Sequence, residues 1–406
     1  SEEKPQRARQ LLTAGFRANG VKNKLASKRS SKSDRMLFQL VNRAMVTCLA
    51  KPQSNVMVSL FTPCEMLHLQ GLHPYSCEGF SSYLSGAMAE QPFLHQAEDT
   101  GIPNSLCSYH KVFIGAAQMG LMPKPRFILS TSLACDANTL TFRHLAQFYD
   151  VPHFNVDIPF ESSPQAVDYV AGQLRQMGEF LTQQTGLPLD DGQLARTVAR
   201  SQRTMALYHR GLRLRAGRQV LSDLTSELLR TAAFHFLLGT PETEAYARQL
   251  LREITTAPPA QGKQLLWIHT TPYWVAPLRH LFAQSTRVQV AACDMSYEGI
   301  VEADPTKPYE AMARRLVYSP FNGPAQRRID RALEMAKTVG ADGAVWFCHW
   351  GCKHTLGGAR LGKKALEEAG LPTLLLDGDS CDRGFGGEGQ AATRMEAFLE
   401  VLEGMA

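Results

Sequence analysis

The chain has 406 residues, of which 44% are hydrophobic and 20% charged, and its formal net charge is +5. The composition is ordinary for a globular protein, and the length exceeds what one hydrophobic core usually fills. No stretch approaches the roughly 20 apolar residues of a membrane helix, and no nucleic-acid-binding motif accompanies the modest positive charge. We therefore expect two domains, no membrane span, no nucleic-acid partner and a cytoplasmic location.

Residues 1–52 are charged and lack strand-like runs, so we predict an N-terminal helical arm. The arm contains a cluster of basic residues, which could attract an acidic partner or an acyl-CoA phosphate. A solvated helix and loop explains the same cluster, and we favour that interpretation. The basic residues are Lys22, Lys24, Lys28, Arg29, Lys32 and Arg35.

Strand-like and helix-like segments alternate over residues 53–162, as in a parallel α/β layer. We predict here a first α/β domain with helices over residues 81–100 and 138–149. Its strands are expected near residues 56–61, 104–107, 126–131 and 153–156.

Residues 163–258 contain no convincing strand and show amphipathic patterns, which predicts a helical connector with breaks at Pro188 and Gly211. The alternation resumes over residues 259–406, the second predicted α/β domain, which ends in a helix over residues 393–402. The expected fold class is therefore α/β, with two flavodoxin- or Rossmann-like parallel sheets. The strands of the second domain are expected at residues 264–268, 287–292, 343–347 and 371–376.

Six of the nine cysteines fall in or beside predicted loops. One buried free cysteine is ordinary, but thiolates grouped at the strand ends of an α/β sheet indicate soft-metal coordination. An odd number of cysteines without secretory features argues against a disulfide framework, so the thiols are expected to be reduced and free to bind metal. The six are Cys64, Cys107, Cys135, Cys348, Cys352 and Cys381.

Iron and sulfide are favoured over zinc, because the thiols are dispersed over two predicted domains and no second paired knuckle accompanies Cys348 and Cys352. Cys293 also follows a predicted strand and Cys77 lies in the segment Tyr75-Ser-Cys-Glu78, so either can replace one of the six, and Cys348 is itself a candidate spare thiol.

His349, between two of the thiols, is the first candidate for proton transfer or for a hydrogen bond to a sulfide. A histidine whose nitrogens are satisfied by the backbone is an equally good interpretation. Glu65, beside Cys64, is a weaker candidate for a catalytic carboxylate.

Two glycine-rich segments resemble nucleotide-binding motifs. Residues 357–364 nearly match a P-loop, but Lys364 stands where a magnesium-binding hydroxyl is required. Residues 384–389 satisfy the dinucleotide pattern, but a polar loop separates them from the preceding strand. We assign neither to a nucleotide, so any energy input is expected from a partner protein.

Six short motifs, taken together, carry a resemblance to a known family. They are Thr62-Pro-Cys-Glu65, Cys107-Ser-Tyr-His110, the segment 131–138 around Cys135, His349-Trp-Gly-Cys-Lys353, Leu376-Asp-Gly-Asp379 and the segment 393–399. The chain resembles, from Val56 to Leu402, the 2-hydroxyacyl-CoA dehydratase and benzoyl-CoA reductase family, and within it the double-cubane cluster proteins.

The resemblance implies two flavodoxin-like domains with an iron–sulfur cluster between them. A separate ATP-hydrolysing reductase, the activator, would supply low-potential electrons. The chain would then be an ATP-dependent iron–sulfur oxidoreductase that forms a homodimer and reduces a small substrate. His349 would deliver the protons. In the double-cubane branch two cubanes joined by a sulfide (8Fe-9S) use six cysteines. By motif position Cys107, Cys135 and Cys352 match the shared ligands, and Cys64, Cys348 and Cys381 the additional ones.

Two alternatives stay open. The first is a 2-hydroxyacyl-CoA dehydratase subunit with a single 4Fe-4S cluster on three cysteines and a deep cleft for an acyl-CoA thioester. The second is a non-catalytic electron carrier or cluster scaffold. Iron and sulfide content per chain separates the first alternative from the double cubane.

Overall fold

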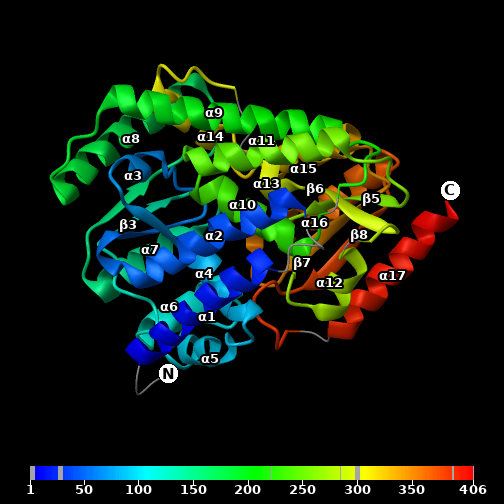
Figure 1. The fold of residues 1–406 in the computed structure, drawn as a ribbon, viewed down its shortest axis with the longest axis horizontal. Coiled ribbons are helices and arrows are strands. Elements are labelled where there is room, and N and C mark those ends of the chain that lie inside the picture. Colours follow the sequence, from blue (N-terminus) through cyan, green and yellow to red (C-terminus); the bar gives the residue numbers. More distant parts are fainter. Residues whose placement is uncertain are drawn as a thin grey trace.

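Two parallel sheets of four strands each, with helices around them, form the framework of the protein (Figure 1). The computed structural model describes residues 5–25, 31–220, 222–283, 285–297, 302–385 and 388–405. The predicted α/β class with two Rossmann-like sheets is confirmed.

The first sheet has the strand order β2-β1-β3-β4, with every neighbouring pair parallel. Its two central strands are buried along their whole length, because helices cover both faces of the sheet. The strands are β1 (Asn55–Val58), β2 (His73–Ser76), β3 (Phe127–Thr131) and β4 (His153–Val156). The helices between them are α3 (Glu65–Leu69), α4 (Cys77–Gly86), α5 (Gln91–Asp99), α6 (Ser108–Gln118) and α7 (Asp136–Tyr149).

The second sheet has the order β6-β5-β7-β8 and is also parallel throughout. Its strands are β5 (Lys263–Ile268), β6 (Val288–Cys293), β7 (Gly343–His349) and β8 (Thr373–Gly378). Its helices are α12 (Ala276–Phe282), α13 (Asp294–Tyr297), α14 (Pro308–Val317), α15 (Ala325–Val339), α16 (Lys353–Glu368) and α17 (Glu388–Gly404).

Both sheets change their direction of growth after two strands. The chain lays down β1 and β2, then crosses to place β3 on the other side of β1, and β5, β6 and β7 repeat this order. In open α/β sheets, ligands bind at such a switch point, outside the carboxyl ends of the strands. The carboxyl ends of β1, β3, β5 and β7 are therefore the places to look for a site.

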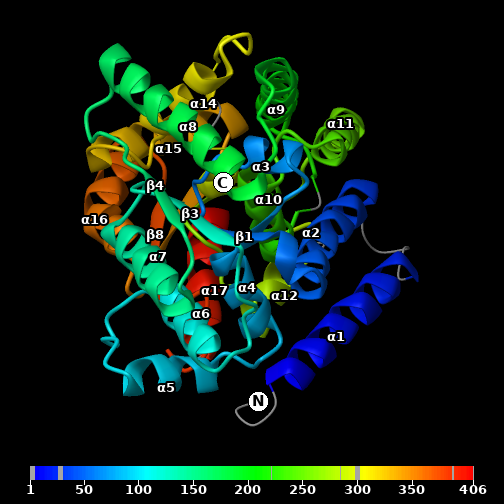
Figure 2. The same ribbon diagram turned by 90° about the vertical axis from the view of Figure 1, so that its left-hand side faces the viewer.

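The remaining helices surround and join the sheets. At the N-terminus lie α1 (Pro5–Leu25), α2 (Lys32–Ala50) and the short 3-10 helix η1 (Pro52–Ser54). Figure 2 shows α1 and α2 together on the side of the first sheet away from α7 and α8. Between the sheets in sequence lie α8 (Pro164–Thr185), α9 (Asp191–Leu214), α10 (Leu224–Phe236) and α11 (Pro241–Thr256), so the predicted helical content of this segment is confirmed.

Capping side chains explain where the four connector helices begin. Each of these helices follows a Ser, Asp or Thr whose side-chain oxygen accepts a hydrogen bond from the backbone N–H three residues later. The capping residues are Ser163, Asp190, Asp223 and Thr240.

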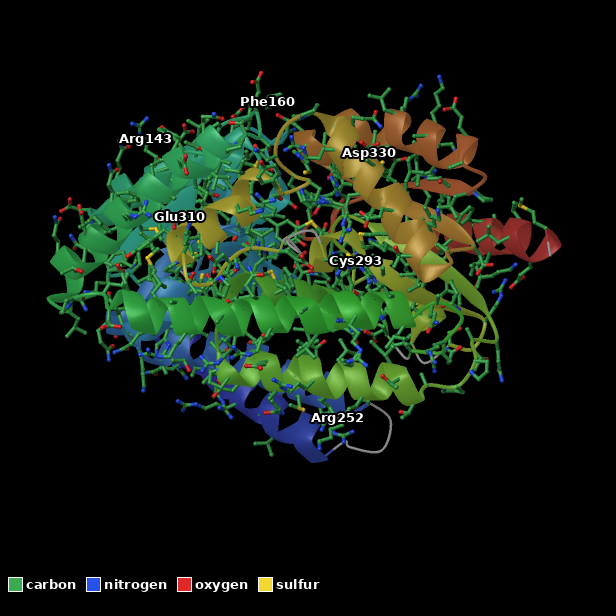
Figure 3. All side chains as sticks on the ribbon, turned by 90° about the horizontal axis from the view of Figure 1, so that it is seen from above. Arg143, Phe160, Arg252, Cys293, Glu310 and Asp330 are labelled. Carbon is green, nitrogen blue, oxygen red and sulfur yellow. The ribbon has the colours of Figure 1, made fainter. Side chains whose placement is uncertain are left out.

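In Figure 3, α9 lies between α11, which carries the labelled Arg252, and α14, which carries Glu310. Because α9 contacts both α3 and α15, it packs against helices of both sheets.

Two predictions about the first sheet are wrong. Residues 104–107 form no strand: they are a turn before α6, in which Leu106 donates its backbone N–H to the Pro103 carbonyl at 3.0 Å. The strand β2 was missed, because its sequence contains Pro74 and has no apolar run. Proline is tolerated there because β2 is an edge strand that pairs with β1 alone.

Three further differences concern glycines and helix ends. The predicted helix over residues 81–100 is two helices, α4 and α5, with Met88 between them in a left-handed conformation (φ 56°). Gly211 lies inside α9 instead of ending it. Residues 357–364 lie inside α16, where a Cβ on Gly362 would collide with the Trp346 ring, so this glycine serves packing.

Several predictions stay predictions. The boundaries at residues 52, 162 and 258 are among them, since helices such as α9 pack against both halves. Lys28 and Arg29 of the basic cluster, and residues 386–387 of the second glycine-rich segment, lie outside the described residues. Within the described part of the chain, no helix combines the length and apolarity needed to cross a membrane.

We predict that Gly115→Ala destabilises the protein. A Cβ at this position in α6 would collide with the backbone carbonyl of Phe93 in α5, so the two helices would have to separate. Overpacking of this kind costs about 1 to 3 kcal/mol, which a lower urea midpoint would report. The control is Gly172→Ala in α8, where a Cβ meets nothing within 4 Å. This change is expected to leave the midpoint unchanged or raise it, since alanine is the better helix former; equal losses in both variants would contradict the prediction.

Candidate functional site

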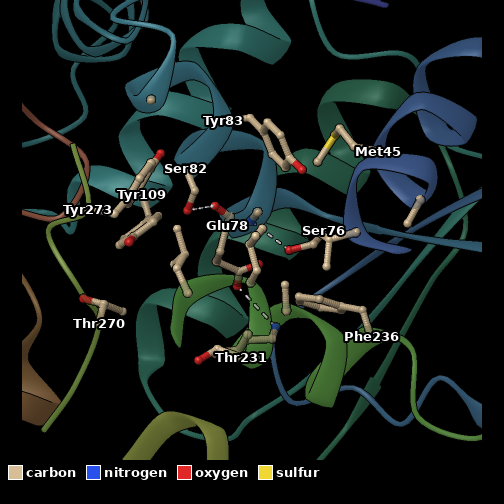
Figure 4. Close-up of a pocket in the computed structure, with 18 of the residues that line it drawn as sticks. Met45, Ser76, Glu78, Ser82, Tyr83, Tyr109, Thr231, Phe236, Thr270 and Tyr273 are labelled. Atoms are coloured by element: carbon tan, nitrogen blue, oxygen red, sulfur yellow. Dashed lines mark hydrogen bonds between the residues drawn. The ribbon is translucent and has the colours of Figure 1, made fainter. Parts of the chain in front are cut away.

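A cavity of about 830 Å³ lies where the carboxyl ends of the two sheets face the N-terminal helices. Residues of α1, α2, α4, α6 and α10, and of the loops after β1, β3, β5 and β7, line it. In the close-up of Figure 4, Met45 and Phe236 lie on one side of the cavity and Thr270 and Tyr273 on the other. A large, mostly apolar cavity with a few convergent polar groups at two switch points is the default place for a ligand.

Three of the predicted thiols line this cavity: Cys107, Cys135 and Cys352. Each is the residue that directly precedes a helix, α6, α7 and α16 respectively. The backbone N–H groups at a helix N-terminus favour negative charge, so these positions suit thiolates. Both halves of the molecule thus contribute thiols to the lining of the same cavity.

Gly351 explains how the second half reaches the first. Its φ is +79°, a left-handed conformation that favours glycine. A Cβ at this position would lie only 2.7 Å from the backbone N and Cα of Cys107. The loop after β7 therefore presses directly against the start of α6, which places Cys352 and Cys107 on the same side of the cavity.

The thiols have raised pKa values, so they need a nearby positive charge to become thiolates. Burial raises the pKa of Cys107 well above its ordinary value, and the neighbouring Cys352, Asp379 and Cys135 raise it further. Burial, with Cys352 adding to it, raises the pKa of Cys135 to about 12. Such thiols become thiolates when a cation compensates their charge, and iron does so in iron–sulfur sites.

The arrangement differs from that of a single-ion site. Among the described residues, no three His, Cys, Asp or Glu side chains gather closely enough to hold one metal ion. A cluster distributes its ligands over several irons, so three thiols from three separate helix ends fit a cluster better than a mononuclear zinc.

His349 lies at the end of β7 with 1% of its surface exposed. Its Nδ1 accepts a hydrogen bond from the backbone N–H of Ser380 at 3.1 Å, and its Nε2 is 3.3 Å from Cys107 Sγ. Burial lowers the pKa of His349, although Asp379 opposes the shift. With Nδ1 accepting, the hydrogen of the neutral ring is on Nε2 and points to the sulfur, so both nitrogens are engaged.

The other three predicted thiols lie outside the cavity wall. Cys64 donates to the Thr62 carbonyl at 3.2 Å and is buried in the core. Cys348 neighbours His349 on β7 and therefore faces the opposite side of the sheet, where it packs in a different core cluster. Cys381 is fully buried against the Ser81 carbonyl, though its charge interacts with that of Cys107. The spare thiols Cys77 and Cys293 are also buried in the core.

Glu65 is part of a buried ion pair. Its two carboxylate oxygens accept hydrogen bonds from Arg315 at 2.7 and 3.0 Å, and Ser201 donates a third at 2.9 Å. Burial alone would raise the pKa of Glu65, but the charge and hydrogen bonds of Arg315 hold it below the ordinary value. Glu65 does not line the cavity. This geometry ties α3, α9 and α14 together and does not position a carboxylate for proton transfer.

Sequence reasoning missed two polar residues of the cavity. Glu78, in the first turn of α4, accepts a hydrogen bond from the Leu60 N–H at 3.3 Å, while its Oε2 has no partner. Burial raises the pKa of Glu78 to about 7. His269 directly follows β5, and neither of its ring nitrogens has a partner among the residues that the structure describes. The position after a predicted strand was a usable signal for His269, whereas Glu78 follows the strand β2 that was missed.

Comparisons with known proteins agree with this geometry. The sequence model of a family described as 2-hydroxyglutaryl-CoA dehydratase, D-component, matches residues 59–402, a span that includes the three cavity thiols. The (R)-phenyllactyl-CoA dehydratase alpha subunit of Clostridium sporogenes is 22% identical over 337 residues, which are 77% of this chain and 80% of that subunit.

We predict that Glu65→Gln lowers the free energy of unfolding by about 3 kcal/mol near neutral pH, since Arg315 would lose its buried counter-charge. Because the folded-state pKa of Glu65 is lowered, the stabilisation is present above the ordinary value of 4.5 and lost as the pH falls below it. The difference between wild type and variant should therefore shrink in acid. Urea unfolding at several pH values measures it.

The matched control is Glu403→Gln, which removes an exposed partner of Arg287. Exposed pairs contribute little because water and salt screen them, so this variant should unfold like the wild type. A Glu65→Gln variant as stable as this control at neutral pH would show that the buried pair is not stabilising.

Proposed function

The chain belongs to the 2-hydroxyglutaryl-CoA dehydratase D-component family, and we propose that it is the component that binds one 4Fe-4S cluster on Cys107, Cys135 and Cys352 and dehydrates a 2-hydroxyacyl-CoA. The observation that carries the proposal is the division of the six candidate thiols: these three line the cavity, whereas Cys64, Cys348 and Cys381 are buried outside its lining.

Cys107, Cys135 and Cys352 would hold a cluster of four irons by three thiolates, which would leave one iron without a protein sulfur. When bound, such a cluster supplies electrons one at a time at low potential. The helix N-termini before which the thiols lie stabilise their negative charge. His349 donates its Nε2 hydrogen to Cys107 Sγ, and hydrogen bonds to ligating sulfurs are one way in which a protein sets the reduction potential.

The cavity supports the acyl-CoA part of the proposal. Its wall is mostly aliphatic and aromatic, so an acyl chain would be stabilised by burial there. Glu78 faces this space with one unpartnered oxygen, and its raised pKa leaves a large fraction of the carboxyl protonated near neutral pH. A protonated carboxyl can donate a hydrogen bond to a leaving hydroxyl group. A relative of this chain is named for phenyllactyl-CoA, whose acyl group is of a kind that this wall suits.

Partners follow from the family resemblance. We propose that a separate ATP-hydrolysing activator delivers the electrons and that a second subunit, a further copy or a related chain, completes the assembly. The activator approaches the side on which the cluster thiols lie.

The first test of the function is anaerobic incubation with activator, ATP and (R)-phenyllactyl-CoA, with the unsaturated acyl-CoA measured by chromatography. Reduction of a second protein without any dehydration would favour an electron carrier instead.

The double cubane of the sequence analysis stays a prediction. It requires Cys64, Cys348 and Cys381 at the same cluster, whereas Cys64 and Cys348 are in different core clusters and face away from the cavity. Forming it would need a rearrangement of β7 or of the segment before α3. The single cubane needs no such change, and we therefore prefer it.

We predict that the anaerobically purified protein contains about four irons and four sulfides per chain, as one cubane requires. Cys107→Ser, Cys135→Ser and Cys352→Ser should each lose most of this iron and the associated visible absorption. Cys64→Ser and Cys348→Ser are the matched controls, since they change buried thiols outside the cavity. About eight irons per chain, lost on changing Cys64 or Cys348, would instead support the double cubane.

A further inference from the structure

His269 is a polar residue of the cavity with two ring nitrogens available for hydrogen bonds. It directly follows β5 at the switch point of the second sheet, and Thr270, the next residue, lies at the edge of the cavity in Figure 4. The side chain lines the cavity, the residue is only 8% exposed, and within the described part of the chain both ring nitrogens lack a partner. Burying a polar atom without a partner is unfavourable, so a bound ligand that supplies the partner would be stabilised at this position.

The backbone of His269 is held in an unusual conformation. Its φ is +84°, in the left-handed region that non-glycine residues rarely adopt. Asp294 Oδ1 accepts the His269 N–H at 2.7 Å, and the other oxygen of Asp294 accepts a hydrogen bond from Arg328 Nε at 2.9 Å within a buried ion pair. Such strain persists where surrounding contacts enforce it, and it is frequent at functional sites. The network therefore fixes the direction of the imidazole.

His349, the histidine that the sequence singled out, lies close by but is already engaged. The centroids of the two rings are 5.9 Å apart. His349 uses one nitrogen on Ser380 and the other on Cys107, whereas His269 uses neither. Of these two imidazoles, His269 is the one free to bind a substrate.

The ring of His269 is neutral. Burial lowers its pKa well below the ordinary value, and the charge of Arg328, His349 and His354 lowers it further. A neutral imidazole has one N–H donor and one acceptor, and at neutral pH it neither releases nor takes up a proton readily. It can hold an oxygen atom by hydrogen bonding without transferring the proton.

We infer that His269 donates a hydrogen bond to the carbonyl oxygen of the acyl-CoA thioester bound in the cavity, an inference that rests on the proposed function. A carbonyl oxygen only accepts hydrogen bonds, so it matches the donor. It is also the atom on which negative charge develops when an electron enters the acyl group. A fixed donor in a dry site stabilises such charge far better than one in water. His269 is thus a catalytic residue, and His349 a positioning residue for the thiol.

The test is isotope-edited infrared spectroscopy of (R)-phenyllactyl-CoA labelled with carbon-13 at the thioester carbonyl. The anaerobic protein with its cluster is used without activator or ATP, so no turnover occurs. In the wild type, the bound carbonyl band should lie below its position in hydrocarbon solvent. In His269→Gly, which suits the same backbone, the band should return toward that position, and the affinity should fall about 2- to 10-fold, as for one lost hydrogen bond.

The control is His68→Gly, a change of another partly buried histidine with an unpartnered ring nitrogen, located in α3 outside the cavity. This variant should keep the wild-type band. Equal bands in wild type and His269→Gly would overturn the inference and leave the proposed function standing. An unshifted band in the wild type would overturn it without any variant. A thioester that fails to bind the wild type in equilibrium dialysis would overturn both.

Discussion

In the proposed function, three sulfur atoms that line the cavity must carry negative charge together, and this is the main physical constraint on the site. Like charges in an apolar interior repel strongly unless a cation is shared among them. Cys107, Cys135 and Cys352 come from three helix starts on two different sheets, so the demand can be met only if both halves hold their relative positions. The close approach of Gly351 to Cys107, the helix N-termini and the hydrogen bond from His349 all act on these sulfurs.

The rigidity of the two halves comes from polar contacts away from the cavity. Glu65, Ser201 and Arg315 join three helices that belong to different parts of the chain. A second buried group, Glu227 with Arg230 and Arg215, joins α10 to the end of α9. Buried pairs of this kind cost desolvation, and their value lies in fixing one arrangement, because any shift would leave a charge unpaired. These ion pairs lie outside the cavity lining, and they help to fix the relative positions of the helices around it.

The fold class could be predicted from the sequence, because parallel strands read as apolar runs. Cys107, Cys135 and Cys352 line the cavity, and their role as ligands stays a prediction. The strand pattern alone could not separate these thiols from Cys64 and Cys348, and only the family motifs divided them. Whether a residue at a strand end points into the cavity depends on a single position along the strand, as His349 and Cys348 show. Glu78 was not singled out because the strand before it, β2, was not predicted: Pro74 made this edge strand look unlike a strand. The position of the His269 side chain depends on a backbone conformation that no sequence motif indicates.

The N-terminal helices have a consequence of their own. Residues of α1 and α2, including Leu12, Phe16 and Met45, form part of the cavity wall, yet they precede residue 59, where the match to the family begins. In the proposed function, the part of the chain that matches the family therefore supplies the thiols for the cluster, whereas α1 and α2 supply part of the wall around the acyl group. Substitutions in these two helices would then alter the room for the acyl group without changing any of the proposed cluster ligands.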